Sequence, residues 1–390
     1  MNNPIAELLG RGVEEVIDYH HLERQLVSKK KLRVKLGIDP TSQNIHIGRA
    51  VLLLKLRAFQ DAGHQAVFIV GDSTGLVGDT SDKDSERPML TEAEVKANMK
   101  TYFEQAYKIL DKKKTEVHYN SKWLNKLGFF ELAKLANLFG LHEMESREII
   151  ARRMKAGQRV SLHEAMYPLL QGYDSVAVKA DLELGGTDQR FNLLAGRRIQ
   201  PLYNQEPQDI LMMGILEGTD GRKMSSSWGN VINVTDEPND MFGKVMSISD
   251  DLIKKYFILA TRVPLGEIDG ILRSNANPRD QKLVLAQKIT ELYYGGKIAA
   301  QAKENFGKKF GKNSSSEIEP DVVLSKKDGE YILLDILVEG KLASSKSEAR
   351  RKIKEGAVNH NQQKITDENA RVKIASGDLF RLGKRFLKIK

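Results

Sequence analysis

Lysine, serine and glycine are concentrated in the stretch TDGRKMSSSWGN at residues 219–230. Lys223 precedes three consecutive serines, and a glycine stands on either side of this group. A loop of this composition can close over phosphate groups, because an ammonium group and several hydroxyls donate hydrogen bonds suited to them. The same composition is common in ordinary surface loops, so other parts of the chain must decide between the two interpretations.

A histidine and a glycine mark a second stretch, GIDPTSQNIHIGR at residues 37–49. We expect His46 at the start of a helix that follows a strand, where backbone N–H groups favour an anion. Gly48 permits a close approach to the backbone. Taken alone, a histidine at such a place is more often a helix cap or a core residue.

The third stretch is YPLLQGYDS at residues 167–175. Tyr167, Gln171 and Asp174 stand at positions i, i+4 and i+7, which lie within about 60° of one another on a helix. We expect this helix to begin near residue 162 and to be kinked by Pro168. The neighbouring residues are apolar, so the carboxylate must be paired within the protein or must bind a polar ligand.

Two loops that follow predicted strands add further candidates, GDSTGLVGDTSDKDSER at residues 71–87 and GGTDQR at residues 185–190. A carboxylate in the first loop suits an ammonium group, and polar groups in the second suit ribose hydroxyls or a carboxylate. The candidate residues of these loops are Asp79, Lys83, Arg87, Asp188 and Gln189.

Alternating strand and helix patterns position these stretches. The expected strands are 31–39, 65–72, 115–120, 181–186 and 209–216, with helices at 46–63, 91–111 and 188–200. This alternation predicts a doubly wound α/β fold with a parallel sheet, in which ligands bind at the carboxyl ends of the strands. The loop stretches all follow strands, so we expect them at one edge of the sheet.

The chain is long enough for several domains. The predicted domains are a Rossmann-like catalytic domain at 1–232 with a helical insertion at about 121–160, an α-helical domain at 233–315, a linker at 316–330 and a small α+β domain at 331–390. The last domain carries 14 Lys and Arg against 7 Asp and Glu, and so accounts for most of the net charge of +9. This asymmetry indicates a module that binds a polyanion.

Several classes of protein are excluded by what the sequence lacks. The chain has no cysteine, which removes disulfides, cysteine-based zinc sites and thiol nucleophiles. Neither GxxxxGK[ST] nor a GxGxxG after the first strand is present, so the common nucleotide-binding fingerprints fail. No apolar run approaches the roughly 20 residues of a membrane span, and the N-terminus does not resemble a signal peptide. We therefore expect a soluble cytoplasmic protein.

The ordered set HIGR, GLVGD…SDKDSER, YPLLQGYDS, GGTDQR and KMSSS resembles the bacterial tyrosyl-tRNA synthetases, a family of class I aminoacyl-tRNA synthetases. HIGR stands for the family's HIGH and KMSSS for its KMSKS. The resemblance implies a homodimer that activates L-tyrosine with ATP to tyrosyl-adenylate and pyrophosphate, and then transfers tyrosine to the 3′-terminal adenosine of tRNA(Tyr). It also implies Mg²⁺ accompanying the ATP, whereas we expect no metal held by the protein alone.

The resemblance implies a role for each candidate. The residues implied to bind tyrosine are Asp174 at the phenol, Tyr167, Gln171 and Asp79 at the α-amino group, and Gln189 near the carboxylate. The residues implied to bind ATP are Asp39, Thr41, His46, Gly48, Arg49, Asp188, Lys223, Ser225 and Ser226, and those implied to be catalytic are His46, Lys223, Lys83, Arg87 and Thr41. Residues 233–315 are implied to bind the anticodon, and residues 331–390 resemble an RNA-binding module shared with a ribosomal protein.

Three positions depart from the family pattern. Lys35 replaces a tyrosine that shares the substrate hydroxyl in many members, so either Asp174 carries more of the recognition or another group helps. Arg49 replaces the second histidine of HIGH, which keeps a donor and adds a permanent charge. Ser226 removes one positive charge from the pyrophosphate site. The candidates to supply that charge are Lys83, Arg87 and Arg222.

Two alternative functions stay open at this point. A tryptophan-specific relative would share the fold, although QGYDS and the basic tail favour tyrosine. An RNA-binding regulator with a degenerate synthetase fold would bind RNA without forming an adenylate, and only Arg49 and Ser226 favour it. For a homodimer, the apolar segment FFELAKLANLFGL at residues 129–141 is compatible with the interface, but it is equally compatible with core packing.

Overall fold

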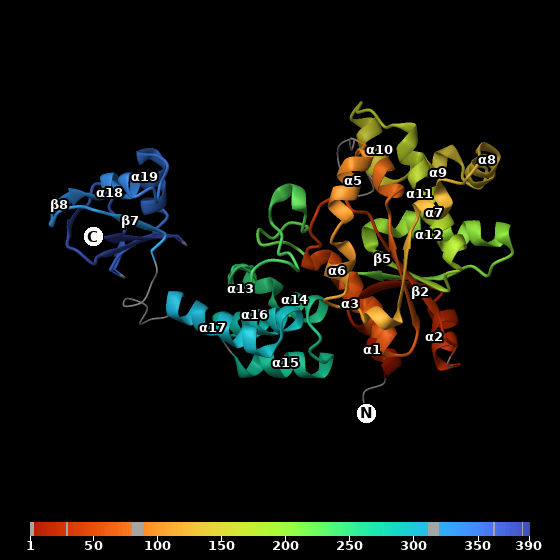
Figure 1. The fold of residues 1–390 in the computed structure, drawn as a ribbon, viewed down its shortest axis with the longest axis horizontal. Coiled ribbons are helices and arrows are strands. Elements are labelled where there is room, and N and C mark those ends of the chain that lie inside the picture. Colours follow the sequence, from red (N-terminus) through yellow and green to blue (C-terminus); the bar gives the residue numbers. More distant parts are fainter. Residues whose placement is uncertain are drawn as a thin grey trace. The chain divides into compact units, whose positions relative to one another are not determined.

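The computed structural model divides the chain into two compact units, Met1–Ala302 and Lys303–Lys390 (Figure 1). The residues it describes are 4–28, 30–79, 89–275, 277–310, 320–361, 363–383 and 385–390. None of the helices in these ranges combines the length and the hydropathy that crossing a bilayer requires.

A six-stranded sheet lies at the centre of the first unit, in the order β1-β6-β5-β2-β3-β4. Its strands are β1 (Val13–Ile17), β2 (Arg33–Ile38), β3 (Gln65–Val70), β4 (Thr115–Tyr119), β5 (Leu182–Gly186) and β6 (Asp209–Met213). All neighbours are parallel except β1, which runs antiparallel to β6. The five predicted strands are therefore observed, and β1 is an additional edge strand.

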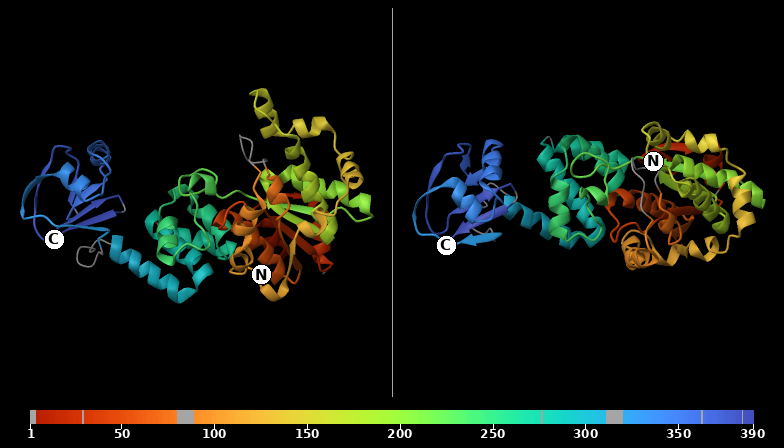
Figure 2. Two further views of the ribbon diagram at one scale, coloured as in Figure 1. Left: turned by 45° about the horizontal axis from the view of Figure 1, so that its top comes forward. Right: turned by 90° about the horizontal axis from the view of Figure 1, so that it is seen from above.

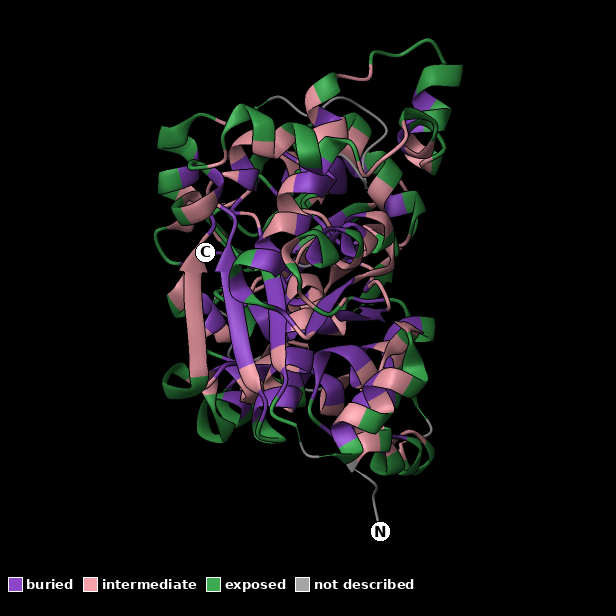
Figure 3. Cartoon of the chain, turned by 90° about the vertical axis from the view of Figure 1, so that its right-hand side faces the viewer, coloured by how far each residue is buried: buried purple, intermediate pink, exposed green. Residues whose placement is uncertain are grey.

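The inner strands are apolar runs because the sheet is covered on both faces. Every residue of β6 is buried, and so is every residue of β3 except the first. The edge strands β1 and β4 have no fully buried residue. Figure 3 shows the same contrast, with the central strands coloured as buried and an edge strand as intermediate.

Two groups of helices cover the sheet (Figure 2). Helix α3 (Ile47–Asp61) connects β2 to β3, whereas α11 (Leu162–Val178) and α12 (Arg190–Ile199) flank β5. The strand order reverses between β2 and β5, so right-handed crossovers place α3 on one face and α11 with α12 on the other. Helix α11 begins at the predicted place, with a capping box at Ser161, and it continues through Pro168.

The remaining helices up to residue 310 range from 4 to 17 residues in length, and the last of them extends from the first unit into the second. They are α1 (Pro4–Gly10), α2 (Tyr19–Val27), α4 (Thr74–Val77), α5 (Glu92–Met99), α6 (Tyr102–Ala106), α7 (Ser121–Leu124), α8 (Phe129–Ala136), α9 (Leu141–Glu145), α10 (Glu148–Lys155), α13 (Pro238–Met246), α14 (Ile253–Ala260), α15 (Leu265–Ser274), α16 (Pro278–Tyr294) and α17 (Gly296–Phe310). The predicted helix at 91–111 is two helices, α5 and α6. The insertion at 121–160 is helical as predicted, and α13–α17 lie within the predicted helical region.

The second unit contains the α+β module. It has a five-stranded sheet in the order β10-β9-β12-β13-β7 and a two-stranded sheet of β11 and β8. Its elements are β7 (Val322–Leu324), β8 (Gly329–Ile332), α18 (Leu333–Glu339), α19 (Lys346–Lys354), β9 (Val358–His360), β10 (Gln363–Ile365), β11 (Arg371–Ile374), β12 (Leu379–Leu382) and β13 (Arg385–Ile389). A core that includes Leu337, Ile353 and Phe380 joins the helices to the strands.

The start of this module requires a correction. A linker was predicted at 316–330 and the module from 331, but β7 pairs with β13 and β8 pairs with β11. The module therefore extends upstream to at least Val322. A strand of three residues has too short a pattern to be recognised without its partner. The predicted fold class, a doubly wound Rossmann-like domain followed by helices and a small α+β domain, is confirmed.

Candidate active site

A cavity of about 260 Å³ opens at the carboxyl ends of β2 and β5, where the strand order reverses. The predicted site residues that line it are Asp39, Thr41, His46, Gly48, Arg49, Asp79, Tyr167, Gln171, Asp174, Asp188, Gln189, Lys223, Ser225 and Ser226. Lys83 and Arg87 lie outside the described residues. The cavity has two parts. The inner half consists of Lys35, Asp79, Tyr167, Gln171, Asp174, Glu183 and Gln189, and the outer half consists of Asp39, Thr41, His46, Gly48, Arg49, Asp188, Lys223, Ser225 and Ser226.

Asp174 is the buried carboxylate of the inner half, with 4% of its surface exposed. Trp123 Nε1 donates to its Oδ1 at 2.7 Å, and Asn120 Nδ2 donates to its Oδ2 at 3.2 Å. Burial raises the pKa of Asp174 to about 7, although Lys35 and the two donors act in the opposite direction. A carboxylate held in this way can accept a hydrogen bond from a ligand hydroxyl.

Sequence reasoning missed Trp123 and Asn120. They belong to NSKW at residues 120–123, which follows β4 at the same edge of the sheet as the other site loops. Their position directly after a strand was the signal in the sequence that could have identified them. Nothing in the local pattern relates them to Asp174, which lies more than 50 residues later.

Lys35 is completely buried and fully occupied by protein groups. Its Nζ lies 2.9 Å from Glu183 Oε1 and donates to Ser175 Oγ at 2.8 Å and to the Gln171 carbonyl oxygen at 2.9 Å. An ammonium group has three protons, so these three acceptors use all of them. This geometry favours the first of the two alternatives for Lys35, in which Asp174 carries more of the recognition.

Tyr167 and Gln189 connect the two walls of the cavity. The Tyr167 hydroxyl donates to Asp39 Oδ2 at 2.9 Å, and burial raises the pKa of Tyr167 well above its usual value. Gln189 Nε2 donates to Asp79 Oδ2 at 2.7 Å. The buried Asn192, which sequence reasoning missed, donates to Gln189 Oε1 at 3.0 Å and so orients the amide of Gln189.

His46 caps α3 as one of the two sequence interpretations predicted. Its Nδ1 accepts from the Arg49 N–H at 3.3 Å, which leaves Nε2 as the nitrogen that carries a proton. Burial, followed by the charges of Arg49 and Lys223, lowers the pKa of His46 to about 3. The imidazole is therefore a neutral donor. Arg49 also donates to Thr41 Oγ1 at 2.7 Å and to the Tyr102 hydroxyl at 3.1 Å.

The loop at 219–230 lies against HIGR at the start of α3. Lys223 Nζ donates to Asp188 Oδ2 at 2.8 Å. Met224 is 3% exposed, and its Sδ accepts from the Gly48 N–H at 3.4 Å. The closest approach at Gly48 is made by the His46 ring, because a Cβ at Gly48 would lie 3.0 Å from His46 Nδ1, whereas Met224 Cβ would be at an ordinary contact distance of 3.4 Å.

Arg222 and Ser226 of this loop are more exposed. Arg222 binds the Asp220 carboxylate through two nitrogens at 2.6 and 2.8 Å and lies over the Trp228 ring. Its charge is thus already compensated, which weakens Arg222 as a source of the charge that Ser226 removes. Ser226 Oγ lies 3.4 Å from Ser42 Oγ across the cavity mouth.

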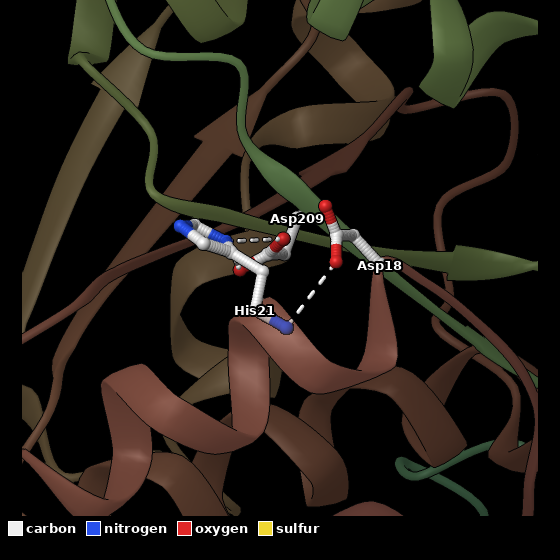
Figure 4. A group of neighbouring side chains, drawn as sticks. All are labelled: Asp18, His21 and Asp209. Carbon is white, nitrogen blue, oxygen red and sulfur yellow. Dashed lines mark hydrogen bonds and ion pairs between the residues drawn. The ribbon is translucent and has the colours of Figure 1, made fainter.

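One group among the described residues offers three side chains of metal-ligand type, namely Asp18, His21 and Asp209 (Figure 4). Asp18 caps α2, and His21 Nδ1 lies 2.9 Å from an Asp209 oxygen. Arg197 lies 3.6 Å from Asp209 and 4.0 Å from Asp18. Because this guanidinium already balances the two acids, the group is an ion-pair network that joins α2 to the start of β6, away from the cavity.

Two family models match the chain. The model described as tRNA synthetases class I (W and Y) matches residues 27–311. The model described as the tyrosine–tRNA ligase SYY-like C-terminal domain matches residues 317–386.

Curated relatives are similar over the full length. The tyrosine–tRNA ligase of Methylococcus capsulatus is 44% identical over 395 residues, which cover 100% of this chain and 99% of that protein. The tyrosine–tRNA ligase of Thermotoga maritima is 46% identical over 385 residues, which cover 97% and 95%.

Solved structures share the fold. The truncated mitochondrial tyrosyl-tRNA synthetase of Aspergillus nidulans has a TM-score of 0.68 at 20% identity, covering 80% of this chain and 95% of that one. The enzyme of Archaeoglobus fulgidus, crystallised with L-tyrosine, has a TM-score of 0.60 at 24% identity, covering 77% and 100%. The motifs, the two matching family models and the full-length relatives agree, and the chain belongs to the tyrosine–tRNA ligases, a family of class I aminoacyl-tRNA synthetases.

Proposed function

We propose that this chain forms tyrosyl-adenylate from L-tyrosine and ATP, and then transfers tyrosine to the 3′-terminal adenosine of tRNA(Tyr), acting in the cytoplasm. The observation that carries the proposal is the buried Asp174, held by two donors beneath a cavity whose mouth carries His46 and Lys223. In such a cavity, the buried carboxylate can accept a hydrogen bond from a substituent of an aromatic ring, and the groups at the mouth can donate to phosphates.

The inner half is proposed to recognise tyrosine. Asp174 accepts the phenol hydroxyl, and Tyr167, Gln171 and Asp79 bind the α-amino group, with Gln189 near the carboxylate. Phenylalanine would leave Asp174 without its partner, and an unsatisfied buried polar group costs about 1–3 kcal/mol, more when charged. The pocket therefore discriminates through the desolvated carboxylate rather than through its shape.

The outer half is proposed to bind ATP through Asp39, Thr41, His46, Gly48, Arg49, Asp188, Lys223, Ser225 and Ser226. The nucleophile is the carboxylate of tyrosine, which is ionised at pH 7, so the reaction requires no general base. The site has to align this carboxylate with the α-phosphate and to donate to the charge that develops on the phosphates. His46 as a neutral donor and Lys223 as a cation meet this need. Lys83 and Arg87 remain predictions from the sequence.

Mg²⁺ is proposed to enter with ATP rather than to occupy a cage of protein ligands. The carboxylates at the cavity mouth are engaged with protein donors, since Asp39 accepts from Thr74 and Tyr167 and Asp188 accepts from Lys223. This donor set suits a metal carried mainly by phosphates, as is usual for Mg²⁺. When bound, the ion would neutralise phosphate charge.

Residues 233–315 are proposed to bind the anticodon, and the basic module is proposed to bind another part of the tRNA. Helix α19 exposes Arg350, Arg351 and Lys354. Replacing Arg350 and Arg351 together by Glu should raise the KM for tRNA about tenfold or more, since each lost phosphate contact weakens binding. The rate of tyrosine-dependent ATP–pyrophosphate exchange should not change. Equal losses in both reactions would contradict this role.

A homodimer is proposed through the helical insertion. Phe129 and Phe130 on α8 are 79% and 81% exposed, and paired aromatic side chains of this kind mark interaction surfaces. Phe129→Glu should shift the sedimenting species from dimer to monomer. A chain that sediments as a monomer before the substitution would refute the dimer.

The decisive test of the function is amino-acid-dependent ATP–pyrophosphate exchange followed by charging of tRNA(Tyr). We expect exchange with tyrosine and none above background with tryptophan or phenylalanine. Exchange with tryptophan alone would overturn the substrate assignment. RNA binding without any ATP–pyrophosphate exchange would favour the alternative function, an RNA-binding regulator with a degenerate synthetase fold.

A further inference from the structure

The loop at 219–230 begins as a short hairpin. The Gly218 N–H donates to the Arg222 carbonyl oxygen at 2.7 Å, and the Met224 N–H donates to the Leu216 carbonyl oxygen at 3.2 Å. Lys223 lies on the returning arm of this hairpin and pairs with Glu217 across it. The direction of the Lys223 side chain therefore depends on what holds this arm in place.

Asn230 lies inside the loop and is 3% exposed. Its Oδ1 accepts from the Ser225 N–H at 2.8 Å. Its Nδ2 donates to the Lys223 carbonyl oxygen at 3.1 Å and to Asp220 Oδ1 at 2.7 Å. The Asn230 side chain thus binds two backbone groups, the Lys223 carbonyl oxygen and the Ser225 N–H. It also connects them to Asp220 in the turn of the hairpin.

The base of the loop is closed around the same residue. The Thr219 N–H donates to the Asn230 carbonyl oxygen at 3.1 Å. A Cβ at Gly218 would lie 2.4 Å from that oxygen and 2.5 Å from Asn230 Cγ, so glycine is required for this contact. The space around Asn230 is therefore too small for the longer side chain of glutamine.

The hydrogen bonds of Asn230 remain available when the loop moves. Within the described chain, those of its side chain end on Asp220, Arg222, Lys223 and Ser225, all inside the loop. Lys223 must leave Asp188 in order to reach phosphates, and this exchange breaks no contact of Asn230. The hydrogen bonds from Asn230 and Arg222 also lower the pKa of Asp220 to about 2, so Asp220 stays an acceptor throughout the physiological range.

We propose that Asn230 is a positioning residue for adenylate formation, which holds the backbone of Lys223 so that the ammonium group reaches the reacting phosphates. This inference rests on the proposed function. It predicts a requirement for the amide itself. A carboxylate of the same size would keep the acceptor for Ser225, but it would face the Asp220 carboxylate and the Lys223 carbonyl oxygen without a proton to donate.

The test compares Asn230→Ala and Asn230→Asp with Asn275→Ala as the matched control. Asn275 also donates to a backbone carbonyl oxygen, that of Ile271, but it lies at the end of α15. The full-length chain is used, and the single-turnover rate of tyrosyl-adenylate formation, the KM for tyrosine and the midpoint of thermal unfolding are recorded for each variant.

Both Asn230 variants should lower the adenylation rate about tenfold or more, because hydrogen bonds that hold the backbone of Lys223 are lost. The KM for tyrosine should change by less than about twofold, and Asn275→Ala should behave as the parent chain. In a Lys223→Ala background, adding Asn230→Ala should cause less than about a twofold further loss, because the two residues act through one contact.

Three results would overturn the inference while leaving the function intact. They are an unchanged adenylation rate in Asn230→Ala, a parental adenylation rate in Asn230→Asp, or a rate in the Lys223→Ala, Asn230→Ala double variant that is lowered by the product of the two single losses. A parent chain that forms no tyrosyl-adenylate would refute the function, and with it the inference. Should Asn230→Ala unfold, Asn230→Ser serves in its place, and its rate should lie between those of the parent and Asn230→Asp.

Discussion

The two halves of the cavity are built in different ways. In the inner half, Asp174 and Lys35 are 4% and 0% exposed, and their partners come from separate elements of the core. In the outer half, the side chains of Lys223 and Asp188 are 32% and 22% exposed and are paired with each other. The inner half is thus formed before any ligand binds, whereas the outer half must exchange partners when phosphates enter.

This difference separates two tasks. Under the proposed function, the desolvated carboxylate of Asp174 discriminates between amino acids, and its loss should affect recognition. The more exposed cation of Lys223 acts on charge that develops during the reaction, and its loss should affect the rate.

Asp174→Ala should lower kcat/KM for tyrosine about a thousandfold. The loss of a charged hydrogen bond costs about 1.5–3 kcal/mol, and the buried Asn120 and the partly buried Trp123 both lose an acceptor. Tyrosine-dependent ATP–pyrophosphate exchange measures the effect. Asp269→Ala, which removes a surface carboxylate paired with Lys254, is the control and should change nothing. Near-normal tyrosine activation by the Asp174→Ala variant would refute the role proposed for Asp174.

Lys223→Ala should lower the rate of adenylate formation about a hundredfold and leave the KM for tyrosine within about twofold. Single-turnover measurements resolve the two quantities. Arg222→Ala, one residue away, is the matched control and should lose less than about threefold, because Arg222 is already paired with Asp220. A comparable loss in both variants would show that Arg222 supplies the charge that Ser226 removes.

Trp123→Phe should raise the KM for tyrosine about tenfold, since it deletes one hydrogen bond to Asp174 and keeps most of the ring. The chain has two tryptophans, and Trp228 lies in the loop at 219–230, outside the inner half, so Trp228→Phe is the matched control. Its KM for tyrosine should equal that of the parent. Equal effects of the two substitutions would argue against separate halves.

The smallest predicted effect is on pH dependence. Burial raises the pKa of Asp174 to about 7, so the carboxylate takes up a proton as the pH falls from about 8 to about 6. The KM for tyrosine should then rise about fivefold, and this rise should be absent in Asp174→Asn. The pKa of His46, lowered to about 3 by burial, keeps the imidazole neutral over the same range, so the KM for ATP should show no inflection from His46. A KM for tyrosine that stays constant between about pH 8 and about pH 6 would contradict the protonation inferred for Asp174.

The site was predictable where its residues follow a local rule. Tyr167, Gln171 and Asp174 share one face of a helix because of the 3.6-residue period, and α11 begins where its capping box predicts. His46 at the N-cap followed in the same way from the strand and helix on either side. These inferences depend only on neighbours in the chain.

Contacts between distant segments were not predictable from the pattern. The ion pair of Lys35 with Glu183 and the hydrogen bond from Trp123 to Asp174 join residues on different elements. The strand at Val322–Leu324 was taken as part of a linker because its partner, β13, lies near the other end of the module. The first and third of these contacts depend on strand register, and the second depends on how α7 packs against α11.

The sequence by itself determined the five parallel strands of the central sheet, the edge at which the site loops gather and the family to which the chain belongs. These follow from hydrophobic periodicity, capping residues and ordered motifs, which are local properties of the chain. Only the tertiary structure decided that Lys35 is fully occupied, that His46 is neutral, that Lys223 binds Asp188 and that Asn230 lies inside the loop. Partner choice and protonation depend on burial and on distances in space, and these quantities exist only once the elements have packed together.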